Sequence, residues 1–283
     1  MDNVAIVEER ETRNGAVSGS APTVLILNLF YSGLAIARQM AGRGVRVVGL
    51  SAHPRIYGNF TRFCEVRSAP NSQEHPEALA EFLLQATPEL QGALIFPTRD
   101  ADVLFLDRFR HELEPFYRLA IPERELLQRV MDKSSLVATA KAAGVPVPRT
   151  AVVSDASQLE QAAGEVGFPC VVKPVRSVDW RLGENWNLVG GRKAFRADSL
   201  AELRKEYGRV SRVGAELMLQ EWIPGSAEQI VVCGGYIGEN SEPLAWFTAR
   251  KIVQSPEDFG TGCVVASEPI PELFELSRRL CRA

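Results

Sequence analysis

The first apolar segments of the chain alternate with amphipathic ones, in the order that a parallel α/β sheet requires. Residues 23–28 are a continuous apolar run of strand length, typical of a strand buried on both faces. Residues 32–40 have helical spacing of apolar positions, and residues 45–50 and 93–97 form further apolar runs. The strand–helix–strand order predicts a Rossmann-like domain over residues 21–123, with right-handed crossovers.

Beyond residue 124 the pattern predicts helices and a second group of strands. A helix predicted at 131–143 is followed by Gly-Val-Pro-Val-Pro, where proline disfavours helical conformation in the preceding residue. A Gly-Glu-Asn-Ser-Glu-Pro turn predicts antiparallel pairing of the strands that flank it. The predicted strands lie at 150–153, 168–174, 217–223, 229–236, 244–253 and 262–267.

These patterns place the protein in the α/β class and divide the chain into four parts. We expect a disordered tail, a Rossmann-like domain, linker helices with a first α+β subdomain, and the start of a second α+β subdomain. Their predicted ranges are 1–20, 21–123, 124–225 and 226–283.

The composition argues against several classes of protein. A net charge of -3 gives no electrostatic case for binding nucleic acid or an anionic membrane. No apolar run approaches the roughly 18 residues of a membrane span, and the first residues do not resemble a signal peptide. Five scattered cysteines without a CxxC pair argue against a disulfide framework or a structural zinc site. We therefore expect a cytoplasmic protein.

Two features near the ends of the predicted N-terminal strands are candidates for ligand binding. Residues 28–33 supply one glycine where the GxGxxG dinucleotide fingerprint requires three, so an NAD-dependent oxidoreductase is disfavoured. Arg99 and Asp100 follow the strand at 93–97, where open α/β sheets place ligands. For Asp100 we favour the simpler interpretation that it caps the next helix.

Lys173 stands at the end of the apolar segment Phe-Pro-Cys-Val-Val-Lys-Pro. A buried ammonium group without an anionic partner costs several kcal/mol. Either the side chain reaches solvent or it binds an anion. The neighbouring motifs favour the second interpretation.

Four short motifs stand in a fixed order around this lysine. They are Asp-Lys at 132–133, Gly-Val-Pro-Val-Pro at 144–148, Phe-Pro-Cys-Val-Val-Lys-Pro at 168–174 and Leu-Gln-Glu-Trp-Ile-Pro-Gly at 219–225. Together they resemble the ATP-grasp superfamily of ligases, which includes carbamoyl-phosphate synthase and biotin carboxylase. The resemblance implies a pre-ATP-grasp domain over 21–123 and an ATP-grasp domain after it.

The resemblance also implies a nucleotide site. Lys133 and Lys173 match positions that bind the ATP phosphates. The adenine would be read along the strand that carries Gln220, by main-chain groups around Glu221 and Ile223. The ribose would be held by a carboxylate further on, for which Glu228 is the best match.

Arg250 and Lys251 match family positions near the phosphates or the acyl phosphate, so both are candidate catalytic residues. Because they are neighbours in a strand, their side chains point to opposite faces and at most one faces the nucleotide. The sequence does not choose between them.

The loop at 175–187 departs from the family pattern. Many relatives have glycine and serine there, whose N–H groups wrap phosphate oxygens. This chain has Arg176 and Arg181 among its residues, and arginine can bind phosphate through its guanidinium group instead.

The family's Mg²⁺-binding carboxylates have no match in this sequence, so we expect a C-terminally truncated ligase. The implied activity is ATP-dependent activation of a carboxylate as an acyl phosphate for attack by an amine, with ATP and Mg²⁺ as cofactors and no metal ligands in this part. Small-molecule carboxylate and amine substrates and a possible homodimer are the expected partners. The alternative is a nucleotide-binding regulatory module without turnover.

Overall fold

The computed structural model describes residues 21–214 and 216–283. The tail predicted at residues 1–20 lies outside the described residues. The chain divides into two compact units, and each is described by itself. The first comprises the described residues up to Asn71 together with His75–Thr98 and Phe109–Ala120. The second comprises Ser72–Glu74, Arg99–Arg108 and the residues from Ile121 onward.

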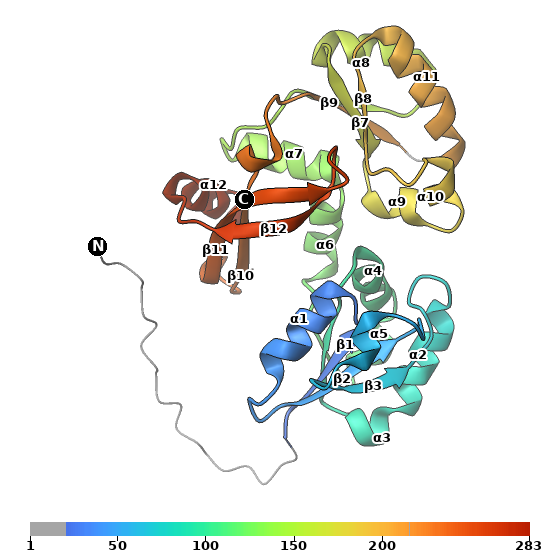
Figure 1. Ribbon diagram of the computed structural model, residues 1–283, viewed down its shortest axis with the longest axis vertical. Helices are drawn as coiled ribbons and strands as arrows, with labels where there is room; N and C mark the ends of the chain where they lie inside the picture. The colour runs from blue at the N-terminus through green and yellow to red at the C-terminus, as the bar shows by residue number, and fades with distance from the viewer. Residues whose placement is uncertain (1–20, 215) are drawn as a thin grey trace. The chain divides into compact units, whose positions relative to one another are not determined.

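The first unit is built on a five-stranded parallel sheet with the strand order β3-β2-β1-β4-β5 (Figure 1). This order is that of a doubly wound Rossmann-like sheet, as predicted. Its strands are β1 (Thr23–Leu27), β2 (Arg46–Ser51), β3 (Glu65–Ser68), β4 (Leu94–Phe96) and β5 (Arg118–Leu119). Its helices are α1 (Tyr31–Met40), α2 (Pro76–Gln85), α3 (Thr87–Leu90), α5 (Arg110–Leu113) and the 3₁₀ turn η1 (Tyr57–Phe60).

The single glycine after β1 has a packing role. A Cβ atom at Gly33 would lie 1.9 Å from the carbonyl oxygen of Asn28, so α1 approaches the end of β1 only because residue 33 has no side chain. The strand itself is buried, with Leu25 and Ile26 fully inaccessible to solvent. Close packing of this helix against this strand therefore accounts for the glycine.

The second unit contains two antiparallel sheets. The first has the strand order β6-β9-β7-β8 and packs against α8 (Leu159–Val166) and α11 (Leu200–Val210) (Figure 1). Strand residues alternate between the two faces: Val172 and Leu219 are buried in the core, whereas Lys173 and Gln220 are half-buried on the other face. These strands are β6 (Thr150–Val153), β7 (Cys170–Pro174), β8 (Phe195–Ala197) and β9 (Leu217–Glu221).

The second sheet consists of three strands in the order β10-β11-β12. One face is covered by α12 (Pro271–Cys281), where Phe274 packs edge-on against Trp246 with ring centroids 5.3 Å apart. The strands are β10 (Val231–Ile237), β11 (Pro243–Ser255) and β12 (Thr261–Ser267). The second unit also contains α4 (Asp100–Arg108), α6 (Arg124–Met131), α7 (Lys133–Ala142) and three 3₁₀ turns, η2 (Ala156–Gln158), η3 (Ser211–Val213) and η4 (Ala227–Gln229).

Two predicted elements differ from the structure. The helix expected over 131–143 is α7, which begins at Lys133 because Asp132 has an extended backbone and caps the helix, with its side chain accepting the Ser135 N–H at 2.8 Å. The loop expected over 175–187 contains the short helices α9 (Ser177–Arg181) and α10 (Asn185–Leu188), which Trp180 anchors in the core.

Candidate functional site

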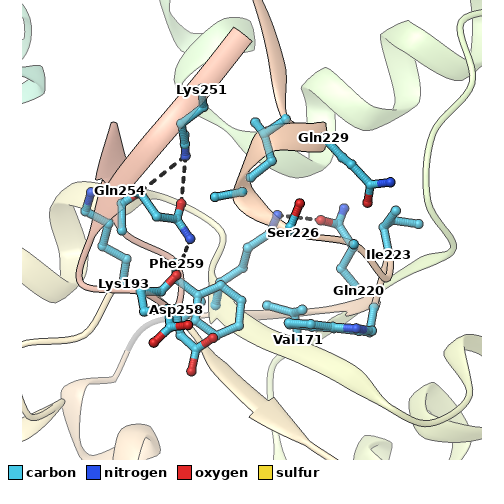
Figure 2. A pocket seen from close by; sticks show the side chains of 18 of the residues that line it. Val171, Lys193, Gln220, Ile223, Ser226, Gln229, Lys251, Gln254, Asp258 and Phe259 are labelled. Carbon is cyan, nitrogen blue, oxygen red and sulfur yellow. Dashed lines mark hydrogen bonds between the residues drawn. The ribbon is translucent and has the colours of Figure 1, made fainter. Parts of the chain in front are cut away.

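A cavity of about 880 Å³ lies between the two sheets of the second unit (Figure 2). Its size is within the range of cofactor-binding pockets. Side chains reach it from the cavity face of β7 and β9, from β11, and from the loop after β11. Its basic lining residues are Lys133, Lys173, Arg181, Lys193 and Lys251, and its acidic ones are Glu221, Glu257 and Asp258.

Lys173 lines the cavity from the middle of the first sheet. Its Nζ donates a hydrogen bond to Gln220 Oε1 at 2.7 Å, which is a neutral acceptor. Burial, and to a smaller extent the positive charge of Lys133, lowers the pKa of Lys173 to about 8. No carboxylate of the described residues forms an ion pair with this ammonium group, so an anion in the cavity would supply its missing counter-charge.

Gln220 is held in one orientation. The Thr150 hydroxyl donates to the carbonyl oxygen of Pro148 at 2.9 Å and accepts from Gln220 Nε2 at 3.0 Å. Since that hydroxyl has a single hydrogen, the amide nitrogen of Gln220 faces Thr150 and the amide oxygen faces Lys173. The chain of hydrogen bonds fixes the position of the lysine.

Lys133 lines the same cavity from the first turn of α7. Its Nζ donates to the carbonyl oxygens of Pro174 and Val175, both at 3.1 Å, and to the Ser177 hydroxyl at 2.9 Å. Burial lowers the pKa of Lys133, and the negative charge of Asp100 partly opposes this effect. The two lysines expected to bind phosphate therefore lie in one cavity, at the end of β7.

The segment after β9 forms an exposed edge of the cavity. The Glu221 carboxylate accepts the Arg149 main-chain N–H at 3.0 Å and its Nε at 3.1 Å, and these bonds lower the pKa of Glu221. Ile223 is 63% exposed. Within the part of the chain that the structure describes, its main-chain N–H and C=O form no hydrogen bond, so they are open to a ligand.

Glu228, the residue expected to hold a ribose, is exposed and is not among the residues that line the cavity. Its main-chain oxygen accepts a hydrogen bond from Arg250 Nη1 at 2.9 Å. The neighbouring Gln229 lines the cavity instead (Figure 2). The ribose role of Glu228 stays a prediction, with Gln229 as the side chain that this turn presents.

The structure distinguishes Arg250 from Lys251. Arg250 pairs with Glu268 through two hydrogen bonds of 2.6 and 2.9 Å and does not line the cavity. Lys251 lines it and donates to Gln254 Oε1 at 2.9 Å (Figure 2). Of these two candidates, only Lys251 is placed to contact a bound molecule directly.

Lys193 is a basic lining residue that was missed in the sequence. Lys193 precedes β8, binds the Thr261 hydroxyl, and points toward the cavity (Figure 2). In the loop after β11, Phe259 packs edge-on against Trp222 with centroids 5.9 Å apart, and the Arg196 guanidinium carbon lies 4.7 Å from the Trp222 ring centroid. A basic residue just before a strand paired with β7 was the available signal for Lys193.

The two arginines of the unusual loop lie in different places. Arg176 is paired with Asp179 through bonds of 2.8 and 3.3 Å and lines a separate cleft of about 470 Å³. Arg181 lines the main cavity, and its guanidinium carbon lies 5.9 Å from the ring centroid of Trp186.

The charge of the cavity favours a polyanionic ligand. Five basic side chains line it, and one of its three acidic residues, Glu221, already pairs with Arg149. A positive cleft with low-dielectric walls concentrates anions. This local excess contrasts with the net charge of -3 for the whole chain.

The described residues provide no cluster of side chains that could bind magnesium beside these basic residues. Residues 21–214 and 216–283 contain no group of three or more histidine, cysteine, aspartate or glutamate side chains arranged to hold a metal ion. The described side chains therefore do not form a Mg²⁺ site by themselves, and no chemical step is assigned to the metal.

Comparison with curated proteins identifies ligases. No protein-family model matches the sequence. D-alanine–D-alanine ligase of Ectopseudomonas mendocina (strain ymp) is 26% identical over 157 residues, 54% of this chain and 47% of that protein. D-aspartate ligase of Enterococcus faecium (strain Aus0004) is 22% identical over 182 residues, 62% and 42% of the two chains. Carbamoyl phosphate synthase large chain of Methanospirillum hungatei JF-1 is 32% identical over 124 residues, which are 40% of this chain and 11% of that protein.

Solved structures show the same fold. The ADP complex of N5-carboxyaminoimidazole synthetase from Staphylococcus aureus superposes with a TM-score of 0.65 at 14% identity, over 92% of this chain and 62% of that one. Biotin carboxylase from Campylobacter jejuni, in a β,γ-ATP complex, superposes with a TM-score of 0.65 at 16% identity. The match covers 92% of this chain and 58% of that one. The chain spans about half the length, or less, of the curated relatives above.

The fold and these relatives define a class of nucleotide-dependent ligases. The chain is similar in sequence to these ligases and shares the fold of the solved structures, which confirms the resemblance to the ATP-grasp superfamily seen in its sequence motifs. Within the described residues, no helix is both long enough and apolar enough to cross a membrane.

Proposed function

We propose that this chain is part of an ATP-dependent carboxylate–amine ligase. The observation that carries the proposal is the cavity itself. It is lined by basic side chains, and at its edge the main-chain groups of Ile223 are open to a ligand. The adenine would bind main-chain groups at Ile223, and its phosphates would bind Lys173 on β7 and Lys133, whose Nζ lies at the end of that strand. The ADP and ATP complexes of the structural neighbours support nucleotide binding.

The proposed reaction has two steps. A carboxylate oxygen of the first substrate attacks the γ-phosphorus of ATP, so that an acyl phosphate forms and ADP leaves. The amine nitrogen of the second substrate then attacks the acyl carbon. The C–O bond to phosphate breaks, inorganic phosphate leaves, and the amine loses a proton to give an amide.

Each basic residue has a defined task in this scheme. Lys133 and Lys173 neutralise the phosphates and hold them in place, and Lys251 stabilises charge on the transferring group or the acyl phosphate. Fixed charges in a site shielded from water act strongly on a phosphoryl group, because they need no reorganisation when the reaction occurs. The names of two relatives, D-alanine–D-alanine ligase and D-aspartate ligase, make amino acids the first carboxylates and amines to test.

The proposal is tested by calorimetric titration of the protein with ATP and Mg²⁺, with NADH as the control ligand. We expect ATP to bind and NADH not to bind. Phosphate release that needs a carboxylate and an amine together would then identify the ligase reaction. ATP binding without such turnover would favour the nucleotide-binding regulatory module.

The Lys173→Ala variant tests the site. We expect ATP affinity to fall by roughly 10- to 100-fold, because a charge-assisted contact to phosphate is worth about 1.5–3 kcal/mol. Lys205→Ala is the matched control, since Lys205 is exposed on α11 and does not line the cavity. Equal ATP affinity of the Lys173 variant and the unaltered protein would show that the nucleotide binds elsewhere.

A further inference from the structure

The basic side chains that line the cavity influence one another through their charges. Charge repulsion from Lys133 acts on Lys173, and repulsion from Arg181 acts on both Lys133 and Lys193. Lys251 in turn acts on Lys193. Arg181 lines the cavity from the last residue of α9, and Ser177, the first residue of the same helix, accepts a hydrogen bond from Lys133 at 2.9 Å.

Arg181 has no anionic partner in the protein. Residues 21–214 and 216–283 provide no ion pair for its guanidinium group, which lies over the ring of Trp186. Arg176, five residues earlier, has the opposite environment, because both of its nitrogen contacts go to Asp179. A guanidinium group among other cations is stabilised when an anion binds between them.

The helix that carries Arg181 is held in place from two sides. Trp180 is buried in the core and packs against Phe195 with ring centroids 5.3 Å apart. The main-chain oxygen of Arg181 accepts a hydrogen bond from Gln73 Nε2 at 2.9 Å. The guanidinium group thus extends into the cavity from a fixed backbone, which lowers the entropy lost on binding.

The strand register shows which part of a nucleotide would reach Arg181. The edge at Glu221 pairs with Cys170, and Lys173 lies three residues further along β7, roughly 10 Å away. Arg181 follows the end of that strand, on the side where Lys133 binds the carbonyl oxygens of Pro174 and Val175. A nucleotide with its base at the edge would place its last phosphate there.

We propose that Arg181 binds the terminal phosphate of ATP, in place of the glycine-rich loop N–H groups that the family pattern leads one to expect. This inference rests on the proposed nucleotide site. The planar guanidinium group offers two parallel N–H donors to phosphate oxygens, which suits a group that gains charge on its outer oxygens during transfer. Arg181 is therefore the residue that distinguishes ATP from ADP.

The test compares ATP and ADP binding by calorimetry for the unaltered protein, Arg181→Gln, Arg181→Lys and Arg176→Gln. We expect Arg181→Gln to weaken ATP binding roughly 10- to 100-fold and ADP binding less than about threefold, since only ATP has the phosphate it contacts. Arg181→Lys should recover part of the loss. Arg176→Gln, in the same helical segment but outside the cavity, should bind both nucleotides normally.

The outcomes separate this inference from the proposed function. If the unaltered protein binds ATP and Arg181→Gln weakens ATP and ADP equally, or neither, the role of Arg181 is overturned and the nucleotide site stands. If the unaltered protein binds neither nucleotide, both proposals fail. Arg181 is exposed, so thermal unfolding should be unchanged in the variants and loss of binding can be read as loss of contact.

Discussion

At the scale of single residues, the site depends on a lysine that has no carboxylate partner among the described residues. Lys173 contacts a neutral amide oxygen 2.7 Å away, and burial together with Lys133 brings its pKa to about 8. This lowered pKa destabilises the folded state below about pH 8, and the penalty disappears as the pH rises from about 8 toward the ordinary lysine value. A bound anion reverses the effect by favouring the charged form.

The lowered pKa of Lys173 predicts the pH dependence of ATP binding. Because ATP binds the protonated lysine, affinity should be constant just below pH 8 and fall by up to about tenfold per pH unit above it. Lys173→Ala should bind weakly with no such fall in that range. Titrations between pH 7 and 9.5 measure both curves, and a parallel decline in the two proteins would assign the titration to another group.

At the scale of elements, the start of α7 positions Lys133. Asp132 is the N-cap of this helix and accepts the Ser135 N–H at 2.8 Å, while the next residue places its ammonium group against the end of β7. The helix boundary and the lysine proposed to bind phosphate are thus adjacent in sequence. A weaker cap would also loosen the site.

The Asp132→Ala variant tests this coupling. Loss of an N-cap costs about 1 kcal/mol of stability, so urea unfolding should shift by that amount and ATP affinity should fall by less than it does in Lys173→Ala. Asp132→Asn is the matched control, because asparagine caps helices about as well. If Asp132→Ala unfolds at the same urea concentration as Asp132→Asn, the cap contributes nothing to stability.

At the scale of the whole molecule, the chain consists of two units with separate hydrophobic cores, and the cavity belongs to the second. A ligand that binds the folded state stabilises it by about 2.7 kcal/mol at a concentration 100 times its Kd. The stabilisation should be greatest in the elements that line the cavity.

The homodimer expected from the sequence stays a prediction, which sedimentation equilibrium tests.

Amide hydrogen exchange with and without ATP measures where this stabilisation falls. We expect slower exchange in β7, β9 and β11 and in the loop at 256–260, which line the cavity. Exchange in β1 and β2 of the first unit should change little. Uniform protection of both units would mean that they open together, and protection confined to the first unit would contradict the site.

The sequence by itself determined the fold class and singled out Lys133 and Lys173, which line one cavity in the structure. Apolar runs of strand length suffice to predict a buried parallel sheet, and the spacing of motifs around Lys133 and Lys173 suffices to place both in one family site. The alternation of strand residues also predicts that Arg250 and Lys251 point to opposite faces, because that property is local to the backbone.

Tertiary structure alone decided which of those faces is the cavity, and which of two arginines reaches it. Lys251 rather than Arg250 lines the cavity, since Arg250 pairs with Glu268, which lies 18 residues further along the chain. Arg181 rather than Arg176 lines it, because Trp180 packs into the core beside Arg181 whereas Arg176 pairs with the nearby Asp179. Lys193 and Gln229 also line the cavity because segments far apart in the chain pack together. Local patterns specify the periodicity of each element, whereas the partner of a charged side chain depends on contacts between residues far apart in the chain.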